Sequence, residues 1–529
     1  MLLPSSCAPS TLLLAAVFAL PIRAQNEIQE LIPNDSVQGD EFGVAVSADG
    51  PFAVVRSQQS AYVFEQTGNN WVQRQELALP EFNNTANFGT SVALLEDLVA
   101  VGTPVGEQAG TITGTVHLFR ESAGAWSYET ELVPTGLGTA RVFGYSLDFD
   151  GASGARRLLV GDPLWAETFF PKGGAFLFEE GPAGWIQTEQ FSAADGSGGD
   201  WFGTSVAVHG DLLAIGARLD DQILSNSGSV YLYSKSASGE YELEQKLIAP
   251  EQLDFAEFGR AIEMSGEWLA VSELRAETNG LQTGLVHLYR RQADEWIPAQ
   301  QLVAKEVSEN DGFGISLDLD GDRLAVGSCY KDTAGIDEGG AYMFENRGGI
   351  WYQISRVSRE QGQSGDLFGW SVAIANDSLL CGTLKDYGSG VGLPGTLHRF
   401  DASESTACQA YLYDSGAAFA NPLTWFTGEL VAGPVVLAIT SADTQAVGEV
   451  TLLAVSAAAD QFPLLGFEVL VDYSTVTVLP MMSFAGFALT SVVFPPAGGL
   501  GAVHLQAFTF STANQTWSSS PGLRVSLCP

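Results

Sequence analysis

The chain has 529 residues, with 62 Asp and Glu against 24 Lys and Arg, so its formal net charge is −38. A surface this acidic argues against nucleic acid as a partner, because binding to phosphates needs a basic footprint, and it disfavours anionic membranes for the same reason. The length is sufficient for two domains.

The N-terminal residues 1–24 have the features of a signal peptide. Their apolar run, residues 11–20, is too short to span a bilayer and is followed by Ala24 and then by polar sequence. We therefore predict an exported protein, secreted or held at the cell surface, with no membrane span after the signal is removed.

Seven Phe-Gly pairs follow, 46 to 59 residues apart, and each has the same upstream partners. The Phe residues are Phe42, Phe88, Phe143, Phe202, Phe258, Phe313 and Phe368. Eleven residues before each Phe stands an apolar residue: Leu31, Leu77, Leu132, Phe191, Leu247, Leu302 or Val357. Six residues earlier, six of the seven units carry Trp or Tyr. A repeat of this length indicates propeller blades rather than a helical solenoid.

One repeat contains four short β-rich runs separated by turn residues. In the unit that starts at Phe202 they are residues 205–208, 212–215, 229–233 and 241–247, which we name strands A, B, C and D. A four-stranded meander cannot bury both of its faces alone, so seven of them are expected to stack radially as a seven-bladed β-propeller. The buried Phe would contact the adjacent blade, and the Gly would permit a close backbone approach.

The N-terminus supplies the strand that the last repeat lacks. No D-type segment follows Phe400, whereas residues 27–32 form such a segment with Leu31 in register to Phe42. We therefore predict that the N-terminal strand completes the seventh blade and leaves no open sheet edge at the seam. The predicted propeller spans residues 25–402.

These motifs resemble FG-GAP repeats, the blades of integrin α-subunit propellers and of many exported bacterial proteins. The resemblance rests on Phe-Gly-x-Ser-Val-Ala, on Val-Gly-Thr-Pro at residues 101–104 or Val-Gly-Asp-Pro at 160–163, and on Gly-x-Val-x-Leu-Phe. Such repeats often hold calcium in the A–B loop. Here most A–B turns are too short to surround an ion that takes six to eight oxygens. Asp318, Asp320 and Asp322 come closest, followed by Asp148 and Asp150, but turn formation is the favoured role and no cofactor is expected.

The repeats end near Phe400, and residues 403–529 have a different composition. Apolar runs there alternate with Gly and Pro turns and show no helical period, which predicts a C-terminal β-sandwich. Cys408 and Cys528 bracket this segment, and in an exported protein they are candidates for a disulfide. Cys329 and Cys381 follow the B strands and are expected to be packed as small apolar residues.

No motif for nucleophilic, zinc or phosphate chemistry occurs in the chain, so no catalytic residue is predicted. The D–A and B–C loops are long, lie on one side of a meander and carry many acidic residues, and long loops on rigid scaffolds usually carry recognition. The candidate binding residues are Asp195, Asp200, Asp220, Asp221, Asp332, Asp337, Glu338 and Trp165. Trp201 and Trp370, beside Phe-Gly pairs, are further aromatic candidates.

The sequence therefore favours a non-enzymatic, monomeric recognition or adhesion scaffold that binds an extracellular protein or polysaccharide through this loop face. Two alternatives remain. One is a polysaccharide-active glycosidase or lyase with its site in the propeller channel, and the other is a structural component of the cell envelope.

Overall fold

The structure is a computed structural model that describes residues 24–402 with short gaps in loops, and the backbone of the strands between residues 412 and 526. The gaps are residue 26 and residues 36–39, 58–59, 80–87, 105–106, 109–110, 113, 136–141, 152–154, 167–169, 279, 307, 333–335, 360–361 and 385–394. The chain divides at Ser405 into two compact units. The signal-peptide prediction lies outside the described residues except for Ala24.

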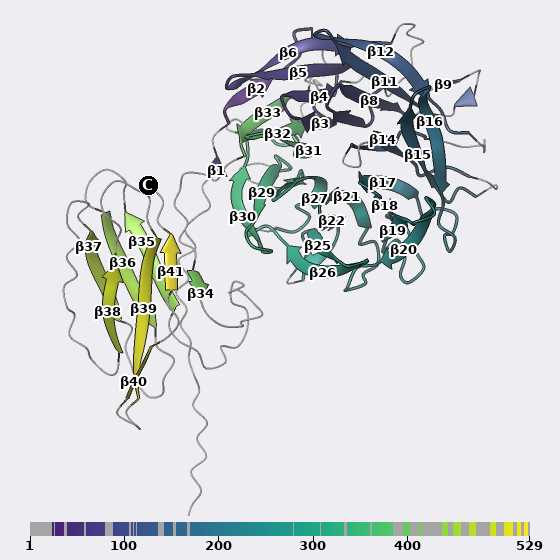
Figure 1. Ribbon diagram of the computed structural model, residues 1–529. Helices are drawn as coiled ribbons and strands as arrows, with labels where there is room; N and C mark the ends of the chain where they lie inside the picture. Colours follow the sequence, from purple (N-terminus) through teal and green to yellow (C-terminus); the bar gives the residue numbers. More distant parts are fainter. Residues whose placement is uncertain are drawn as a thin grey trace, which may run out of the picture. The chain divides into compact units, whose positions relative to one another are not determined.

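Seven four-stranded antiparallel blades surround one axis, so the propeller has the predicted number of blades (Figure 1). Blade 1 consists of β3 (Val46–Asp49), β4 (Phe52–Arg56), β5 (Ala61–Thr67) and β6 (Asn70–Leu77). Blade 2 consists of β7 (Val92–Leu95), β8 (Leu98–Thr103), β11 (Thr115–Ser122) and β12 (Ala125–Leu132). Blade 3 consists of β13 (Ser146–Asp150), β14 (Arg157–Asp162), β15 (Gly174–Gly181) and β16 (Gly184–Phe191). Blade 4 consists of β17 (Phe202–His209), β18 (Leu212–Ala217), β19 (Ser229–Lys235) and β20 (Tyr241–Leu247). Blade 5 consists of β21 (Phe258–Ser265), β22 (Trp268–Glu273), β25 (Leu285–Gln292) and β26 (Glu295–Leu302).

Blade 6 consists of β27 (Phe313–Asp320), β28 (Arg323–Ser328), β29 (Gly340–Asn346) and β30 (Trp351–Val357), and β1 (Ala24–Gln25) lies parallel to β30. Two small hairpins, β9 (Glu107–Gln108) with β10 (Thr111–Ile112) and β23 (Glu277–Thr278) with β24 (Leu281–Gln282), lie in B–C loops. The A strands β3, β7, β13, β17, β21, β27 and β31 contact one another in a closed ring around the axis.

Blade 7 joins the two ends of the propeller segment. Its strands β31 (Phe368–Ala375), β32 (Ser378–Thr383) and β33 (Leu397–Asp401) are followed in the sheet by the N-terminal β2 (Gln29–Leu31). Strand β2 is antiparallel to β33, with Leu31 opposite Leu397, and the two lie side by side in Figure 1. The Leu31 side chain is 4% exposed and packs in one cluster with Phe42 and Trp71.

The Phe-Gly pairs form the inner joints between blades, as the repeat pattern predicts. All seven Phe side chains are fully buried. Each following Gly has a positive φ, and its backbone closely approaches the preceding blade. Gly382 in the B strand β32 is equally restricted, because a Cβ there would lie 1.8 Å from the carbonyl oxygen of Gly43. These joints leave no room for a side chain.

Two further sets of contacts join the blades, and neither was anticipated from the sequence. In the A strands of five blades, a Ser hydroxyl donates to the carbonyl of the next Phe-Gly glycine, as Ser371 does to Gly43 at 2.6 Å. In the D strands, a Gln side chain forms two hydrogen bonds with the backbone of the aromatic residue on the next blade. Gln29 makes this pair of bonds with Trp71, at 2.8 and 2.9 Å. The equivalent pairs are Gln75 with Trp126, Gln245 with Trp296, and Gln300 with Trp351.

The C-terminal unit contains two antiparallel sheets. One comprises β34 (Leu412–Asp414), β41 (Leu523–Ser526), β39 (Ala502–Ser511) and β38 (Phe487–Val493), with β40 (Thr516–Ser519) paired to β39. The other comprises β35 (Val436–Ala442), β36 (Gly448–Val455) and β37 (Leu465–Val471). The unit is therefore β-structured, and the sandwich stays a prediction. Cys408 and Cys528 lie outside the described residues, so their pairing also stays a prediction, whereas Cys329 and Cys381 are buried and unbridged.

Candidate binding face

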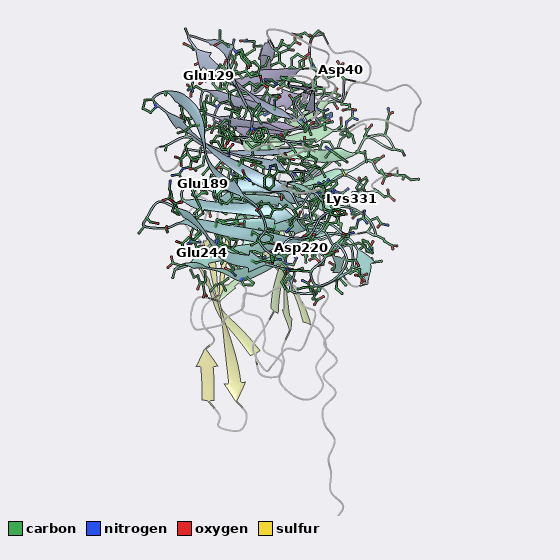
Figure 2. All side chains as sticks on the ribbon, turned by 90° about the vertical axis from the view of Figure 1, so that its right-hand side faces the viewer. Asp40, Glu129, Glu189, Asp220, Glu244 and Lys331 are labelled. Atoms are coloured by element: carbon green, nitrogen blue, oxygen red, sulfur yellow. The ribbon has the colours of Figure 1, made fainter. Side chains whose placement is uncertain are left out.

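The D–A and B–C loops lie on the same face of the propeller. Figure 2, an edge-on view, shows Asp40 from a D–A loop together with Asp220 and Lys331 from B–C loops toward one face. Glu129, Glu189 and Glu244, from the outer strands, lie toward the other. We call the first face the loop face.

Backbone hydrogen bonds join the loops of this face in pairs. From blade 3 to blade 6, each B–C loop accepts a hydrogen bond from the D–A loop that leads into the next blade. The bonds are Gly199 N to Pro171 O at 2.8 Å, Phe255 N to Ser225 O at 2.7 Å, Asn310 N to Gln282 O at 2.5 Å, and Gly365 N to Ile336 O at 2.9 Å. Because the loops support one another, their side chains are presented from a fixed backbone.

Three of the predicted binding residues are buried and support these loops. Asp220 is 3% exposed; it accepts a hydrogen bond from Ser229 at 2.6 Å and pairs with Lys246 at 2.8 Å. Asp200, also 3% exposed, accepts a hydrogen bond from the Ser197 amide at 2.6 Å. Trp165 is 3% exposed and packs edge-on against Phe176. A ligand on the face cannot reach these side chains unless the loops move.

The other predicted residues remain accessible. Asp221 and Asp332 are exposed, whereas Asp337 and Glu338 are half-buried. The Asp195 carboxylate is also accessible and pairs with Lys246, the same lysine that neutralises Asp220. This pairing, with hydrogen bonds from Tyr231 and Gln222, outweighs the opposing effect of burial and lowers the pKa of Asp195 to about 2.

Exposed apolar residues interleave with the accessible acids on the same loops. Those from blades 3 to 6 are Phe170, Ile223, Phe255, Leu281, Tyr330 and Ile336. The two largest exposed fractions are 68% for Phe170 and 70% for Ile336. Sequence reasoning concentrated on the acidic residues and missed this apolar component. Its sequence signal was the presence of large apolar residues inside loops otherwise rich in Asp, Gly and Ser.

The calcium candidates do not converge. Asp318 accepts a hydrogen bond from the Ile374 amide of the next blade at 2.5 Å, Asp320 pairs with Arg323 at 3.1 Å, and Asp322 accepts from Asn346 at 2.8 Å. Within the described part of the chain, no group of three or more His, Cys, Asp or Glu side chains is placed to hold a metal ion. The cofactor expectation stays a prediction.

Asp148, Glu263 and Asp318 instead occupy equivalent positions, five residues after the Phe, on the A strands of blades 3, 5 and 6. The charges of these three carboxyl groups influence one another, even though blade 4 lies between blades 3 and 5. The carboxyl groups therefore lie close to the propeller axis, where the A strands meet. Burial among the inner strands is the main cause that raises the pKa of Asp148 to about 8 and that of Asp318 to about 7, and it raises the pKa of Glu263 as well.

We expect these carboxyl groups to make the propeller less stable as the pH rises. Unfolded carboxyls lose their protons near pH 4, so between about pH 4 and pH 8 the folded state binds more protons and the free energy of unfolding falls with increasing pH. Replacing Asp318 with Asn keeps the acceptor for Ile374 but removes the charge. Asp318→Asn should raise the melting temperature at pH 8.5 by roughly 2 °C and leave it unchanged at pH 4.5.

Thermal unfolding followed by circular dichroism at both pH values checks this, with Asp294→Asn as the exposed control. An equal shift at both pH values, or a lower melting temperature at pH 8.5, would show that ionisation of the Asp318 carboxyl group does not destabilise the propeller.

A shallow hollow of about 440 Å³ lies on the opposite face, at the A–B turns of blades 1 and 2. Its lining includes Asp49, Glu96, Asp97 and Glu121 beside Phe52. Asp97 already pairs with Arg156 at 2.6 Å, and Asp49 accepts a hydrogen bond from the Glu96 amide at 2.6 Å. Asp49 therefore joins blades 1 and 2, and Asp97 joins blade 2 to blade 3.

The fold and the joints between blades define this chain as a seven-bladed β-propeller protein. Residues 185–233 and 296–344 match the family model of the FG-GAP repeat. Each matched segment runs from the aromatic residue of one outer strand to the C strand of the next blade, which is the register read from the sequence. The chain therefore contains FG-GAP repeats in these two segments.

Among curated proteins, none matches the chain in sequence. Solved structures resemble it only distantly. A chain of the mitotic checkpoint complex is 10% identical with a TM-score of 0.45, over 76% of this chain and 96% of that one. The β-propeller domain of the Trilobed protease from Pyrococcus furiosus is 10% identical with a TM-score of 0.39, over 68% of this chain and 95% of that one. An extracellular domain from B. thetaiotaomicron is 11% identical with a TM-score of 0.39, over 93% of this chain and 53% of that one. Likenesses this low carry no functional argument.

None of the described residues lies in a helix that is long and apolar enough to cross a membrane.

Proposed function

We propose that this protein is an exported, non-enzymatic recognition scaffold that binds an extracellular protein or polysaccharide through the loop face of blades 3 to 6. The observation that supports the proposal best is the series of paired loops with exposed apolar side chains. Exposed apolar residues gathered on one face commonly mark an interaction surface, and a backbone that is already ordered loses little entropy on binding.

Replacing exposed residues of the loop face should abolish binding without unfolding the protein. Phe255→Ser combined with Ile336→Ser removes two side chains that are 50% and 70% exposed, so the effect on stability should be small. We expect at least a tenfold loss of binding on an array of extracellular proteins and glycans, since central apolar contacts carry much of the binding energy.

The matched control is Val72→Ser with Ile186→Ser, at outer-strand positions that are 46% and 56% exposed. If the control pair weakens binding as much as the loop-face pair, recognition does not depend on the loop face. Charge reversal at Asp221 and Asp332 tests the acidic component separately. Asp220 is unsuitable for this purpose because its carboxylate is buried against Lys246.

A polysaccharide-active enzyme is the second candidate, favoured by the carboxyl groups near the axis, because burial raises their pKa values and raised pKa values are typical of general acids. Against it, Asp148 and Asp318 accept hydrogen bonds from amides of the next blade, and the Ser47 hydroxyl does the same at the equivalent position of blade 1. This repetition favours a role in joining blades. Polysaccharide cleavage that is lost in Asp148→Asn would instead establish the enzyme.

A further inference from the structure

Three arginines converge on one glutamate where the loop face meets the A strands. Glu257, which is 7% exposed, lies 2.5 Å from Arg218, 3.5 Å from Arg275 and 4.0 Å from Arg260. One carboxylate cannot neutralise three guanidinium groups, so the cluster keeps an excess of positive charge. In a chain with a net charge of −38, a local excess of this kind is unexpected from composition.

The arginines retain unused hydrogen-bond donors. In the described part of the chain, the buried Nε atoms of Arg218 and Arg260 have no hydrogen-bond partner. Arg275 is 55% exposed and Arg260 is 23% exposed, so both can be reached from solution. A guanidinium binds carboxylate or sulfate oxygens through paired N–H groups, so the exposed parts of Arg260 and Arg275, rather than the buried Nε atoms, are the donors available to such an anion.

Aromatic rings flank the cluster on both sides. The Arg218 guanidinium lies 4.6 Å from the centre of the Trp201 ring, which in turn packs edge-on against Tyr145. On the other side, the charges of Arg260 and Arg275 act on the hydroxyl of Tyr330, a residue that is 37% exposed. The carboxylate of Asp337 is also near this hydroxyl. Aromatic surface beside charged donors is typical of sites that orient a ligand by its polar groups.

The backbone at two of these residues favours glycine, yet neither is a glycine. The residue before the Phe-Gly pair adopts a positive φ in five blades, at 50° for Glu41, 58° for Trp201, 57° for Glu257, 67° for Gly312 and 50° for Leu367. Gly312 satisfies the turn without strain, whereas a larger side chain in this conformation is strained. This conformation is a feature of the repeat, because Glu41 and Leu367 share it outside the cluster; in blades 4 and 5 it places Trp201 and Glu257 beside the arginines.

We propose that the cluster formed by Arg218, Arg260, Arg275 and Glu257, with Trp201 and Tyr330 beside it, binds an anionic oligosaccharide through a carboxylate or sulfate group. The proposal rests on the recognition role of the loop face. It specifies the class of ligand that binds the part of this face next to the A strands. A saccharide is favoured over an extended peptide because the aromatic rings of Trp201 and Tyr330 lie beside the charged donors, and this combination suits a sugar ring that carries an anionic group. The surrounding acids disfavour a densely charged ligand and favour one with few anionic groups.

Isothermal titration of the full-length protein tests the proposal with four probes: galacturonate trisaccharide, its 6-O-sulfated galactose counterpart, neutral galactose trisaccharide and a triaspartate peptide. We expect binding of the uronate or of the sulfated sugar, and the comparison between these two identifies the anion. The neutral sugar and the peptide should not bind. Arg260→Gln should weaken binding by about tenfold, because it removes a charge-assisted donor and no hydrogen bond within the described structure.

Arg290→Gln is the matched control, because Arg290 also lies over a Trp ring, that of Trp268, and pairs with a glutamate, Glu267. It should leave the affinity unchanged. Should Arg260→Gln lower the melting temperature, Arg275→Gln provides the same test at a more exposed position. No binding of either anionic sugar, equal binding of triaspartate, or an equal loss in Arg290→Gln would overturn the saccharide site. Array binding that depends on Phe255 and Ile336 would still stand, so failure of this inference differs from failure of the proposed function.

Discussion

Replacing Gly382 with Ala should destabilise the propeller by about 3 kcal/mol or more, because the new methyl group has no space at the joint between blades 7 and 1. A Cβ at this position would lie 1.8 Å from the Gly43 carbonyl oxygen and 2.4 Å from the Ser371 hydroxyl. Neither neighbour can move freely, since Ser371 donates a hydrogen bond to that same carbonyl at 2.6 Å. The blades would have to separate at the seam.

Chemical denaturation measures this effect, with Gly181→Ala as the control. Gly181 lies in a C–D turn where the nearest atom to an added Cβ is 3.7 Å away, and its φ is not positive. Gly382 likewise has no positive φ, so the contrast between the two variants reports steric exclusion rather than backbone strain. Equal denaturation midpoints for the two variants would show that the blade joints tolerate a side chain.

Removing the buried side chain of the N-terminal strand should have an effect of similar size. Leu31→Ala is expected to destabilise the propeller by about 2–5 kcal/mol, because Leu31 is 4% exposed and packs against Phe42 and Trp71. Gln29→Ala should cost less, about 1–2 kcal/mol, through loss of its two hydrogen bonds to Trp71.

Ile32→Ala provides the control, since its side chain is 44% exposed one residue further along the chain. Denaturant melts followed by the fluorescence of the eleven tryptophans measure the change in the free energy of unfolding. Native-state hydrogen exchange should show faster exchange in β33 before the other blades, because the seam opens first. If Leu31→Ala lowers the free energy of unfolding as little as Ile32→Ala does, then β2 contributes little to closing the ring of blades.

The repeats by themselves predict the blade architecture. The distance from Leu31 to Phe42 equals the distance from Leu302 to Phe313, and a side chain can be buried at every copy only if each copy adopts the same fold. The pattern therefore predicted strand order, buried positions and the need for Gly at the joints. The observed blade 4 agrees closely, with β20 spanning Tyr241–Leu247 as expected and β17 starting three residues earlier than expected, at Phe202.

The candidate site was less accessible to sequence reasoning, because its properties depend on which side chains meet. Asp220 and Asp221 are neighbours in the sequence, yet one is buried against Lys246 and the other faces solvent. Composition could not separate them, since a carboxylate in an acidic loop has the same sequence signature whether or not a cation pairs with it. The apolar residues of the loop face were equally hidden, because exposure is a property of the packed loops.

The sequence by itself therefore determined the number of blades, their register and the position of the loops, since these follow from periodic burial along one chain. Only the tertiary structure decided which charges are neutralised and which are in excess. Arg218 follows β18 of blade 4, whereas Arg260 lies in β21 and Arg275 follows β22 of blade 5, and none occupies a position that the repeat keeps. Radial stacking brings the three arginines to one glutamate. The interaction energy of these charges depends on the distances between them, which residue spacing in the sequence does not encode.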